Sequence, residues 1–397
     1  MARNKTVYTC TECGYQSAKP LGRCFNCKGW GTLEEQRPSE QPILSSLSAI
    51  ARPQKLAEIE LGSSDEIRHR TGMSELDNVL GGGLVGGSLV LLGGDPGVGK
   101  STLLLAAMES FGKRGLPVLY VTGEESLRQV RLRADRLGVR GESISLLATT
   151  DFQVVDANVR ESKPLVCVID SVQTMQLPEV QGIPGSMSQV REVAHRAMVL
   201  AKTCNVAILL VGHITKSGQL AGPKVLEHFV DTVLQFEGDG RTTLRILRSV
   251  KNRFGPAGEL GLFEMAETGL RQVPDASARL LSERRNDAPG TAVIATLEGS
   301  RPLLIEVQAL VGRPIPANPS RTCVGVDRTR TQMLIAVLEK AGLPLHDRDV
   351  FVNAAGGVRL DDTAADLGVI AAIASSLADR AVREDTLLIG EVGLRLL

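Results

Sequence analysis

The sequence is poor in aromatic residues, has no surplus of either charge and contains no long apolar run. Phe, Trp and Tyr make up 3% of its 397 residues, which argues against base stacking on an aromatic platform as the main way of binding nucleic acid. Its 45 basic and 45 acidic residues balance, so a polyanion would have to meet a local basic patch. No stretch reaches the roughly 18 apolar residues of a membrane span, and no membrane partner is expected. The first residues lack the pattern of a secretory leader, which predicts a reducing, cytoplasmic location without disulfides.

Cysteine is concentrated at the N-terminus. Four of the seven cysteines form two Cys-x2-Cys pairs within the first 27 residues, namely Cys10 with Cys13 and Cys24 with Cys27. Two such pairs can hold one Zn²⁺ in a tetrahedron of thiolates, and so short a segment needs the metal to fold because it buries little apolar surface. Disulfides and free thiols are the alternatives, and a reducing compartment disfavours disulfides. The spacing predicts a zinc ribbon over residues 1–33.

Basic side chains outnumber acidic ones in this segment. With the thiolates left out, residues 1–30 carry five Lys or Arg and one Glu. Such a surface is compatible with a nucleic-acid backbone or with an acidic protein, and the sequence does not choose between them. Residues 34–66 are polar and contain Pro and Ser, which predicts a linker with little structure of its own.

A phosphate-binding loop follows the linker. An apolar strand at 88–92, a glycine-rich turn and an apolar helical pattern from about Gly99 succeed one another, and the turn fits G-x-x-x-x-G-K-S/T. The glycines let backbone N–H groups converge on phosphates, Lys100 is expected to reach the β- and γ-phosphates of ATP, and Ser101 to bind Mg²⁺. The predicted nucleotide-binding residues are Gly94, Asp95, Pro96, Gly97, Val98, Gly99, Lys100, Ser101 and Thr102.

Carboxylates end two further apolar runs. Asp170 closes PLVCVIDS and is expected to help hold the nucleotide's Mg²⁺. Glu124 and Glu125 close PVLYVTGEES, where a carboxylate can orient or deprotonate the water that attacks the γ-phosphate. Alternatively, a glutamate here caps the next helix. Glu124 is the preferred catalytic candidate because it is closer to the strand.

A histidine and two polar stretches complete this region. His213 ends the apolar run NVAILLVGHITK, where it either senses the γ-phosphate or is an ordinary hydrogen-bonded loop residue. The glycine-bearing stretches 178–189 and 216–224 are expected to be loops at the carboxyl edge of a parallel sheet, where function usually sits.

These features together resemble one known family. The four-cysteine ribbon, the loop GDPGVGKST, the strand ends YVTGEES and VCVIDS, and the pentapeptide KNRFG at 251–255 are similar to the RadA (Sms) family of bacterial RecA-like DNA repair proteins. The resemblance covers essentially the whole chain. It implies an α/β fold: the zinc ribbon, a RecA-like P-loop NTPase core at 67–272 with a mostly parallel sheet, a connector at 273–285, and an α+β domain at 286–397 that resembles the Lon protease domain.

The resemblance also implies an activity. The protein would be a DNA-stimulated ATPase that forms a hexameric ring and drives branch migration on single-stranded and branched DNA during homologous recombination and DNA repair. Glu124 would be the catalytic carboxylate, Lys251 and Arg253 would act on a neighbouring subunit's nucleotide, and the loops 178–189 and 216–224 would line the DNA channel. The ribbon would offer a site for recombinase or replication proteins. A RecA-like regulatory ATPase that switches protein contacts without moving along DNA is the alternative.

The Lon-like region lacks the protease nucleophile. Where the Lon pattern has Pro-Ser-Ala-Gly, this chain reads Thr363-Ala364-Ala365-Asp366, and the methyl group of Ala364 cannot attack a peptide bond. The domain is therefore expected to be a scaffold for oligomerisation and DNA contact, not a protease. The chain stops at LLIGEVGLRLL, close to where the family usually continues, so a truncated sequence is expected.

Overall fold

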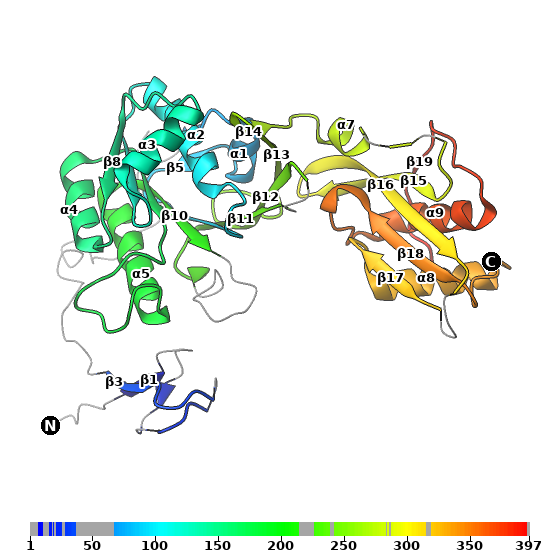
Figure 1. The fold of residues 1–397 in the computed structure, drawn as a ribbon, viewed down its shortest axis with the longest axis horizontal. Coiled ribbons are helices and arrows are strands. Elements are labelled where there is room, and N and C mark those ends of the chain that lie inside the picture. The colour runs from blue at the N-terminus through cyan, green and yellow to red at the C-terminus, as the bar shows by residue number, and fades with distance from the viewer. Residues whose placement is uncertain are drawn as a thin grey trace, which may run out of the picture. The chain divides into compact units, whose positions relative to one another are not determined.

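The computed structural model describes most of the chain, which divides into two units, and a small N-terminal sheet belongs to the first of them (Figure 1). Unit 1 takes in residues 1–237, 247–257 and 265–271, and unit 2 takes in 238–246, 258–264 and 272–397. The described residues are 7–10, 16–17, 19, 21–25, 28–36, 67–213, 226–238, 242–282, 284–285, 287–314 and 319–394.

The N-terminal sheet has three short antiparallel strands. Strand β1 (Val7–Cys10) pairs with β2 (Gln16–Ser17) and with β3 (Leu33–Gln36). Cys10 pairs with Leu33 in this register, and the pairing of β1 with β3 continues to Gln36. The ribbon sheet therefore runs three residues beyond the boundary expected at residue 33.

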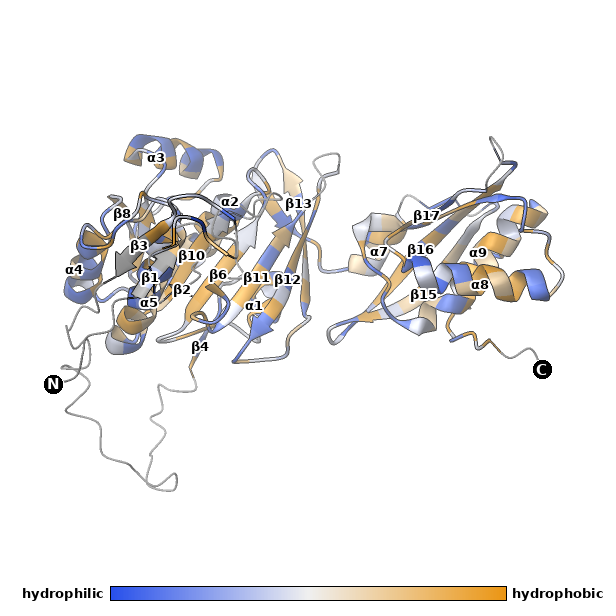
Figure 2. Ribbon diagram, turned by 90° about the horizontal axis from the view of Figure 1, so that it is seen from below, coloured by the Kyte–Doolittle hydropathy of each residue, from blue (hydrophilic) through white to orange (hydrophobic). Residues whose placement is uncertain are grey.

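Nine strands form the central sheet, in the order β14-β13-β12-β11-β6-β10-β9-β7-β8. Every pairing from β11 through β8 is parallel, which confirms the expected α/β core with a mostly parallel sheet. Figure 2 shows β6 and β10 as hydrophobic along most of their length, as expected for strands that are buried on both faces. The strands are β6 (Leu89–Gly94), β7 (Val118–Thr122), β8 (Ile144–Ala148), β9 (Val166–Asp170), β10 (Ala207–His213), β11 (Thr232–Glu237), β12 (Leu244–Asn252), β13 (Leu260–Ala266) and β14 (Gly269–Gln272).

Helices cover both faces of this sheet. The crossovers through α2 and α3 advance in one direction along the strand order, and those through α4 and α5 return. Because such crossovers are right-handed, α2 and α3 lie on one face and α4 and α5 on the other (Figure 1). These helices are α2 (Lys100–Lys113), α3 (Leu127–Arg136), α4 (Phe152–Ser162) and α5 (Met187–Cys204), preceded by α1 (Ser74–Val79) and the β4–β5 pair (Arg68–His69, Leu84–Val85). Within the described part of the chain, no helix is long and apolar enough to cross a bilayer.

Unit 2 is built on a five-stranded mixed sheet in the order β17-β18-β16-β15-β19. The long strands β15 and β16 form an antiparallel pair, β16 pairs antiparallel with β18, and the two edge strands add in parallel. The elements are β15 (Thr291–Glu298), β16 (Arg301–Gly312), β17 (Arg321–Val324), β18 (Asp349–Ala354), β19 (Leu387–Leu388), α7 (Ala276–Leu281), α8 (Arg328–Lys340) and α9 (Asp366–Ala378). This is the mixed α+β architecture expected for the C-terminal region.

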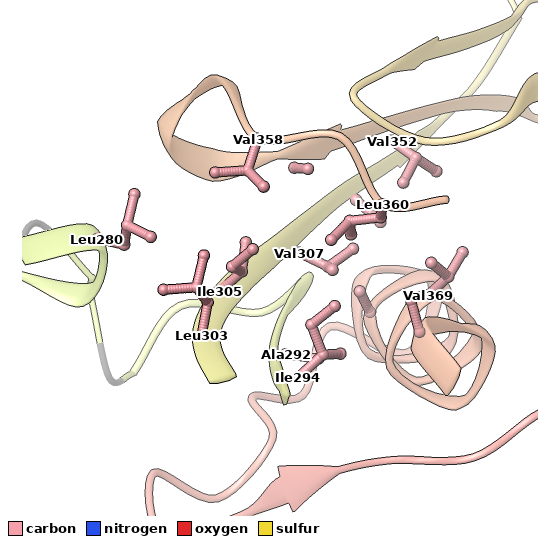
Figure 3. Close-up of a cluster of buried hydrophobic side chains, with 14 of the residues drawn as sticks. Leu280, Ala292, Ile294, Leu303, Ile305, Val307, Val352, Val358, Leu360 and Val369 are labelled. Atoms are coloured by element: carbon pink, nitrogen blue, oxygen red, sulfur yellow. The ribbon is translucent and has the colours of Figure 1, made fainter. Parts of the chain in front are cut away.

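The core of unit 2 explains why it begins before residue 286. Leu303, Ile305 and Val307 of β16 belong to the same buried cluster as Val369 of α9, which Figure 3 draws. Residues from the ends of β12 and β13 join the same core, as do two residues of α7, a helix in the expected connector. These additional core residues are Leu244, Ile246, Leu260, Leu262, Ala276 and Leu280.

Candidate active site at the carboxyl edge of the parallel sheet

The phosphate-binding loop joins the end of β6 to the start of α2, and its conformation requires glycine. Gly97 and Gly99 have φ angles of +79° and +112°, in the left-handed region that side chains disfavour. A Cβ on Gly94 would approach the Phe236 carbonyl oxygen to 2.4 Å. The loop thus keeps close to β11 and leads into the amino end of α2, where N–H groups are available for phosphate oxygens.

Lys100, the first residue of α2, is held at this loop. Its ammonium donates to the carbonyl oxygens of Gly94 and Asp95, at 2.8 and 3.0 Å, and lies 3.2 Å from His213 Nδ1. Burial lowers the pKa of Lys100, and the carboxylates of Asp170 and Glu124 oppose that shift. The nearby negative charges thus favour a charged amine at the position where the loop meets phosphate.

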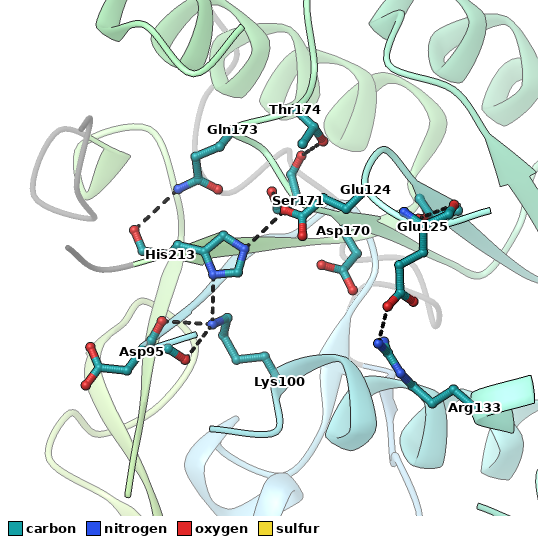
Figure 4. A network of polar contacts seen from close by, with 12 residues as sticks. Asp95, Lys100, Glu124, Glu125, Arg133, Asp170, Ser171, Gln173, Thr174 and His213 are labelled. Carbon is teal, nitrogen blue, oxygen red and sulfur yellow. Dashed lines mark hydrogen bonds and ion pairs between the residues drawn. The ribbon is translucent and has the colours of Figure 1, made fainter. Parts of the chain in front are cut away.

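Glu124 joins this group from the loop after β7. Its Oε1 accepts a hydrogen bond of 2.6 Å from Ser171 Oγ and lies 3.2 Å from His213 Nε2, as Figure 4 shows. The His213 hydrogen bond, helped by Ser171 and Lys100 and opposed by burial, lowers the pKa of Glu124 to about 2. A carboxylate with so low a pKa is ionised at neutral pH but is a weak base, which suits orienting a water more than removing its proton.

Glu125 points to a different partner. Its carboxylate forms an ion pair with Arg133 of α3. The cap of α3 is Ser126, which forms a reciprocal capping box with Gln129. Neither Glu124 nor Glu125 caps the helix, so that interpretation of the two glutamates is wrong.

Asp170 ends β9 and is nearly buried. One of its oxygens accepts a hydrogen bond of 2.6 Å from Tyr120 OH, and burial together with the Asp170 charge raises the pKa of Tyr120 well above its usual range. The Tyr120 proton therefore stays on the phenol and orients the carboxylate. Asp170 and the Ser101 hydroxyl supply oxygen donors of the kind that Mg²⁺ prefers. The sequence analysis missed Tyr120 and Ser171, although both lie in or directly after the strands that it identified.

The loop 178–189 is organised by a buried glutamine. Gln189, 2% exposed, donates to the carbonyl oxygens of Leu177, Val180 and Gly182 and accepts from the Leu177 N–H. The loop thereby presents Ile183 with 77% of its surface exposed. The other expected loop, 216–224, lies outside the described residues.

Lys251 and Arg253 lie at the opposite edge of the same sheet. Lys251 donates to the backbone oxygens of Glu227 and Val230, just before β11 begins. Arg253 lies 3.4 Å from Asp231 Oδ1, and the other oxygen of Asp231 accepts from the N–H of Leu89, the first residue of β6. The phosphate-binding loop follows the far end of β6, roughly 17 Å away at 3.3 Å per residue.

The rest of the KNRFG segment shapes a turn. Asn252 Oδ1 accepts from the Phe254 N–H at 2.9 Å, and Arg68 donates to the Phe254 carbonyl oxygen at 2.6 Å. A Cβ on Gly255 would come within 3.0 Å of Gly81 Cα. Asn252, Phe254 and Gly255 thus fix the backbone beside Lys251 and Arg253.

Two of the four predicted zinc ligands are described. Cys10 and Cys24 are 2% and 1% exposed, and the Cys10 thiol contacts Thr32 Oγ1 at 3.2 Å. The Cys24 N–H donates to Gly29, and the Cys24 carbonyl accepts from Lys28, which closes the second cysteine turn. Buried sulfur donors on a strand end and a tight turn fit a Zn²⁺ site. Their expected partners Cys13 and Cys27 lie outside the described residues.

Polar contacts within unit 2 surround Ala364, the position at which the expected Lon likeness would place a nucleophile. Asp366, 3% exposed, forms an ion pair with Arg330 and accepts from the Val392 N–H. The Ala364 carbonyl accepts from the Gly390 N–H at 2.9 Å. The segment near 390 therefore lies directly against Ala364.

Comparison with known proteins identifies the family of this chain. Family models for a rubredoxin metal-binding domain and for an AAA domain match residues 8–35 and 56–219. The DNA repair protein RadA of Halalkalibacterium halodurans is 46% identical over 400 residues, which are 99% of this chain and 87% of that protein. RadA proteins of Bacillus subtilis and Pseudomonas aeruginosa are 44% and 48% identical, with the same coverage of both chains. A solved KaiC-like protein of Pyrococcus horikoshii matches 52% of this chain and 99% of its own length, at 20% identity and a TM-score of 0.44. On the strength of the RadA relatives, and as the sequence motifs predicted, this chain belongs to the family of the DNA repair protein RadA.

Proposed function

We propose that this protein is a cytoplasmic, DNA-dependent ATPase of homologous recombination and DNA repair, which drives branch migration as a ring-shaped, hexameric oligomer. The observation that carries this proposal is the arrangement of charges on one sheet. Lys100, Glu124 and Asp170 meet at its carboxyl edge, and Lys251 and Arg253 lie at its amino edge.

The carboxyl edge supplies most of an ATP hydrolysis site. ATP would supply the phosphoryl group that is transferred, and Mg²⁺ would neutralise negative charge on its phosphates. The loop N–H groups and Lys100 would bind the β- and γ-phosphates, and Ser101 and Asp170 would hold the metal. Glu124, ionised and fixed by Ser171 and His213, would orient the attacking water.

The amino edge would complete a neighbouring site. Cations that neutralise charge on the transferring phosphoryl group are needed for fast turnover, and such cations are often supplied by another subunit. Lys251 and Arg253 lie near the start of β6, whereas the phosphate-binding loop of the same chain follows the end of β6, roughly 17 Å away. Neither side chain can span that distance. The distance of Lys251 and Arg253 from their own loop supports a head-to-tail assembly, in which these two side chains reach the nucleotide of the next subunit. Head-to-tail contacts of this kind form a ring when the last subunit meets the first.

His213 would couple DNA to hydrolysis. It contacts both Lys100 and Glu124, and residues 214–225 follow it directly in the chain. DNA that contacts the loops 178–189 and 216–224 would bias the position of His213 and so the position of Glu124. This is how DNA would stimulate turnover.

Two further assignments belong to the proposal. Cys10, Cys13, Cys24 and Cys27 would hold one structural Zn²⁺, and the ribbon would be available to recombination or replication proteins. Unit 2 would be a scaffold for oligomerisation and DNA contact without protease activity, because Ala364 offers no nucleophile. Metal analysis of protein purified without chelator should give one zinc per chain.

The decisive experiment measures ATP turnover with and without single-stranded and forked DNA, together with the mass of the assembly. We expect DNA to raise turnover and the assembled protein to move a branched junction. If DNA leaves turnover unchanged and no junction moves, the protein is instead a nucleotide-dependent switch for protein contacts.

A further inference from the structure

The two most exposed aromatic side chains of the described residues lie on the ribbon. Trp30, the only tryptophan of the chain, is 76% exposed, and Phe25 is 64% exposed. Phe111, Phe152 and Phe236, by contrast, are buried. Although aromatic residues are scarce in this sequence, two of them lie exposed in one small turn, residues 22–31.

The backbone of this turn holds the Trp30 ring beside a cation. Arg23 and Trp30 form an antiparallel bridge, and Gly31 N–H donates to the Gly22 carbonyl at 2.8 Å. Cross-strand neighbours share one face of a hairpin, and the Arg23 guanidinium indeed lies over the Trp30 ring, 5.7 Å from its centroid. Arg23 also donates to the Lys28 carbonyl at 2.9 Å. The guanidinium is thus tethered on the indole, which stays largely open to solvent.

The charged residues nearest to the two rings in the sequence are all basic. Residues 16–33 contain three cations, Lys19, Arg23 and Lys28, and no Asp or Glu. All three cations are exposed. A polyanion would therefore meet positive charge beside two flat apolar surfaces.

We propose that Trp30 and Phe25 form a stacking platform for single-stranded DNA, with Arg23, Lys19 and Lys28 contacting its phosphates. Exposed rings bind unpaired bases through their π-faces without regard to sequence, and adjacent cations follow the backbone. The choice of DNA as the strand rests on the proposed function. The platform is an additional contact, outside the ATPase core.

The surroundings of the rings favour a single strand over other partners. Protein hot spots of Trp and Arg are usually enclosed by further contact residues that exclude water. Apart from the two rings and the buried Cys24, the described residues between 22 and 31 are three glycines and the cations Arg23 and Lys28, and these offer few apolar groups to enclose the rings. A duplex keeps its base faces stacked inside and offers none to the rings along its length. Docking of an acidic protein is the competing interpretation, and indole emission that stays unchanged while oligo(dT) binds would favour it.

The single tryptophan makes the test direct. Fluorescence of the indole in the full-length, zinc-loaded protein reports on the ribbon alone, because no other tryptophan is present. We expect oligo(dT) to quench this emission along the same binding curve that the anisotropy of a labelled oligo(dT) follows, and a matched duplex to quench it far less. Binding by anisotropy with unchanged emission would overturn the platform but leave DNA binding by the core intact. If anisotropy shows no binding of any DNA, both the platform and the proposed function fail.

Variants separate stacking from charge and folding. Trp30→Ala and Phe25→Ala should each weaken oligo(dT) binding about tenfold, Trp30→Phe should keep most of the affinity, and zinc content should be unchanged in all three. Leu132→Ala, which removes a 60% exposed apolar side chain from α3, is the matched control and should bind normally. If Trp30→Ala and Phe25→Ala bind oligo(dT) like the wild type, the inference is wrong.

Discussion

Glu124 and Glu125 are adjacent in the chain, yet their carboxylates serve different neighbours. Glu124 accepts from Ser171 and faces His213 and Lys100, whereas Glu125 pairs with Arg133 of the following helix. The two residues share composition and sequence context, so a comparison of their variants isolates the effect of position.

Glu124→Gln should retain ATP binding and lower kcat by about 100-fold or more, because an amide cannot accept a hydrogen bond from water in the way a carboxylate does. Glu125→Gln should keep most of the activity and cost no more than about 1 kcal/mol of stability, since its ion pair with Arg133 is partly exposed. Steady-state turnover and nucleotide binding by equilibrium titration measure both. The reverse result, with Glu125→Gln as the inactive variant, would transfer the catalytic role.

The pKa of Glu124 gives a pH prediction with a definite sign. Its carboxylate is stabilised mainly by His213, with a pKa of about 2, so in the wild type it should remain ionised throughout the range in which the protein is active. Any stability from this site is present above pH 4.5 and is lost as the pH falls towards 2. His213→Ala removes the main cause of the shift and should raise the pKa of Glu124, so the acid limb of the kcat profile should move to higher pH.

His213→Gln is the control for this profile, because its amide can still donate a hydrogen bond to Glu124. It should lie closer to the wild type than His213→Ala does. An unchanged acid limb in His213→Ala would mean that His213 does not control the charge of Glu124.

The separation of Lys251 from the phosphate-binding loop predicts complementation between subunits. Lys100→Ala and Lys251→Ala should each be nearly inactive alone. In a mixed assembly, the intact loop of a Lys251→Ala subunit can meet the intact Lys251 of a Lys100→Ala neighbour. If equal amounts of the two variants mix at random in a ring, roughly one quarter of the sites are complete. Turnover of the mixture should therefore exceed the sum of the separate variants, and a mixture no more active than its parts would place Lys251 outside the neighbour's site.

The sequence was sufficient for features that depend on local order. The phosphate-binding loop and the end of β9 each carry their pattern within a few residues, and parallel strands bring their carboxyl ends to one edge. The placement of Lys251 and Arg253 could not be derived in this way, because it depends on β11 lying beside β6 across a separation of 142 residues. Glu124 and Glu125 have different partners because different side chains face each of them in the folded protein. Neither the periodicity nor the spacing of the sequence contains that information. The helix α7 within the expected connector could not be derived from the sequence for the same reason, since Ala276 and Leu280 are buried in the core of unit 2.

Gln189 should matter for DNA stimulation more than for basal turnover. Its side chain makes four hydrogen bonds to the backbone of Leu177, Val180 and Gly182, so Gln189→Ala should loosen the loop and cost about 1–3 kcal/mol in stability. We expect the DNA-stimulated rate to fall while the rate without DNA changes little. Thr203→Ala removes an exposed hydroxyl from the far end of the same helix and serves as the control. Equal losses of basal and stimulated rates in Gln189→Ala would indicate a general folding defect.

Restoring a serine in unit 2 should not create a protease. In Ala364→Ser the new hydroxyl would need a lysine to remove its proton, as in a Ser-Lys pair, and residues 286–397 contain only Lys340, which is exposed at the end of α8. The nearby cation is Arg330, and its hydrogen bond to Asp366 raises its already high pKa, so it cannot act as a base. Casein incubated with Ala364→Ser should therefore stay intact, with or without ATP. Cleavage that appears in this variant and disappears in Ala364→Ser combined with Lys340→Ala would show that the protease site is one substitution from activity.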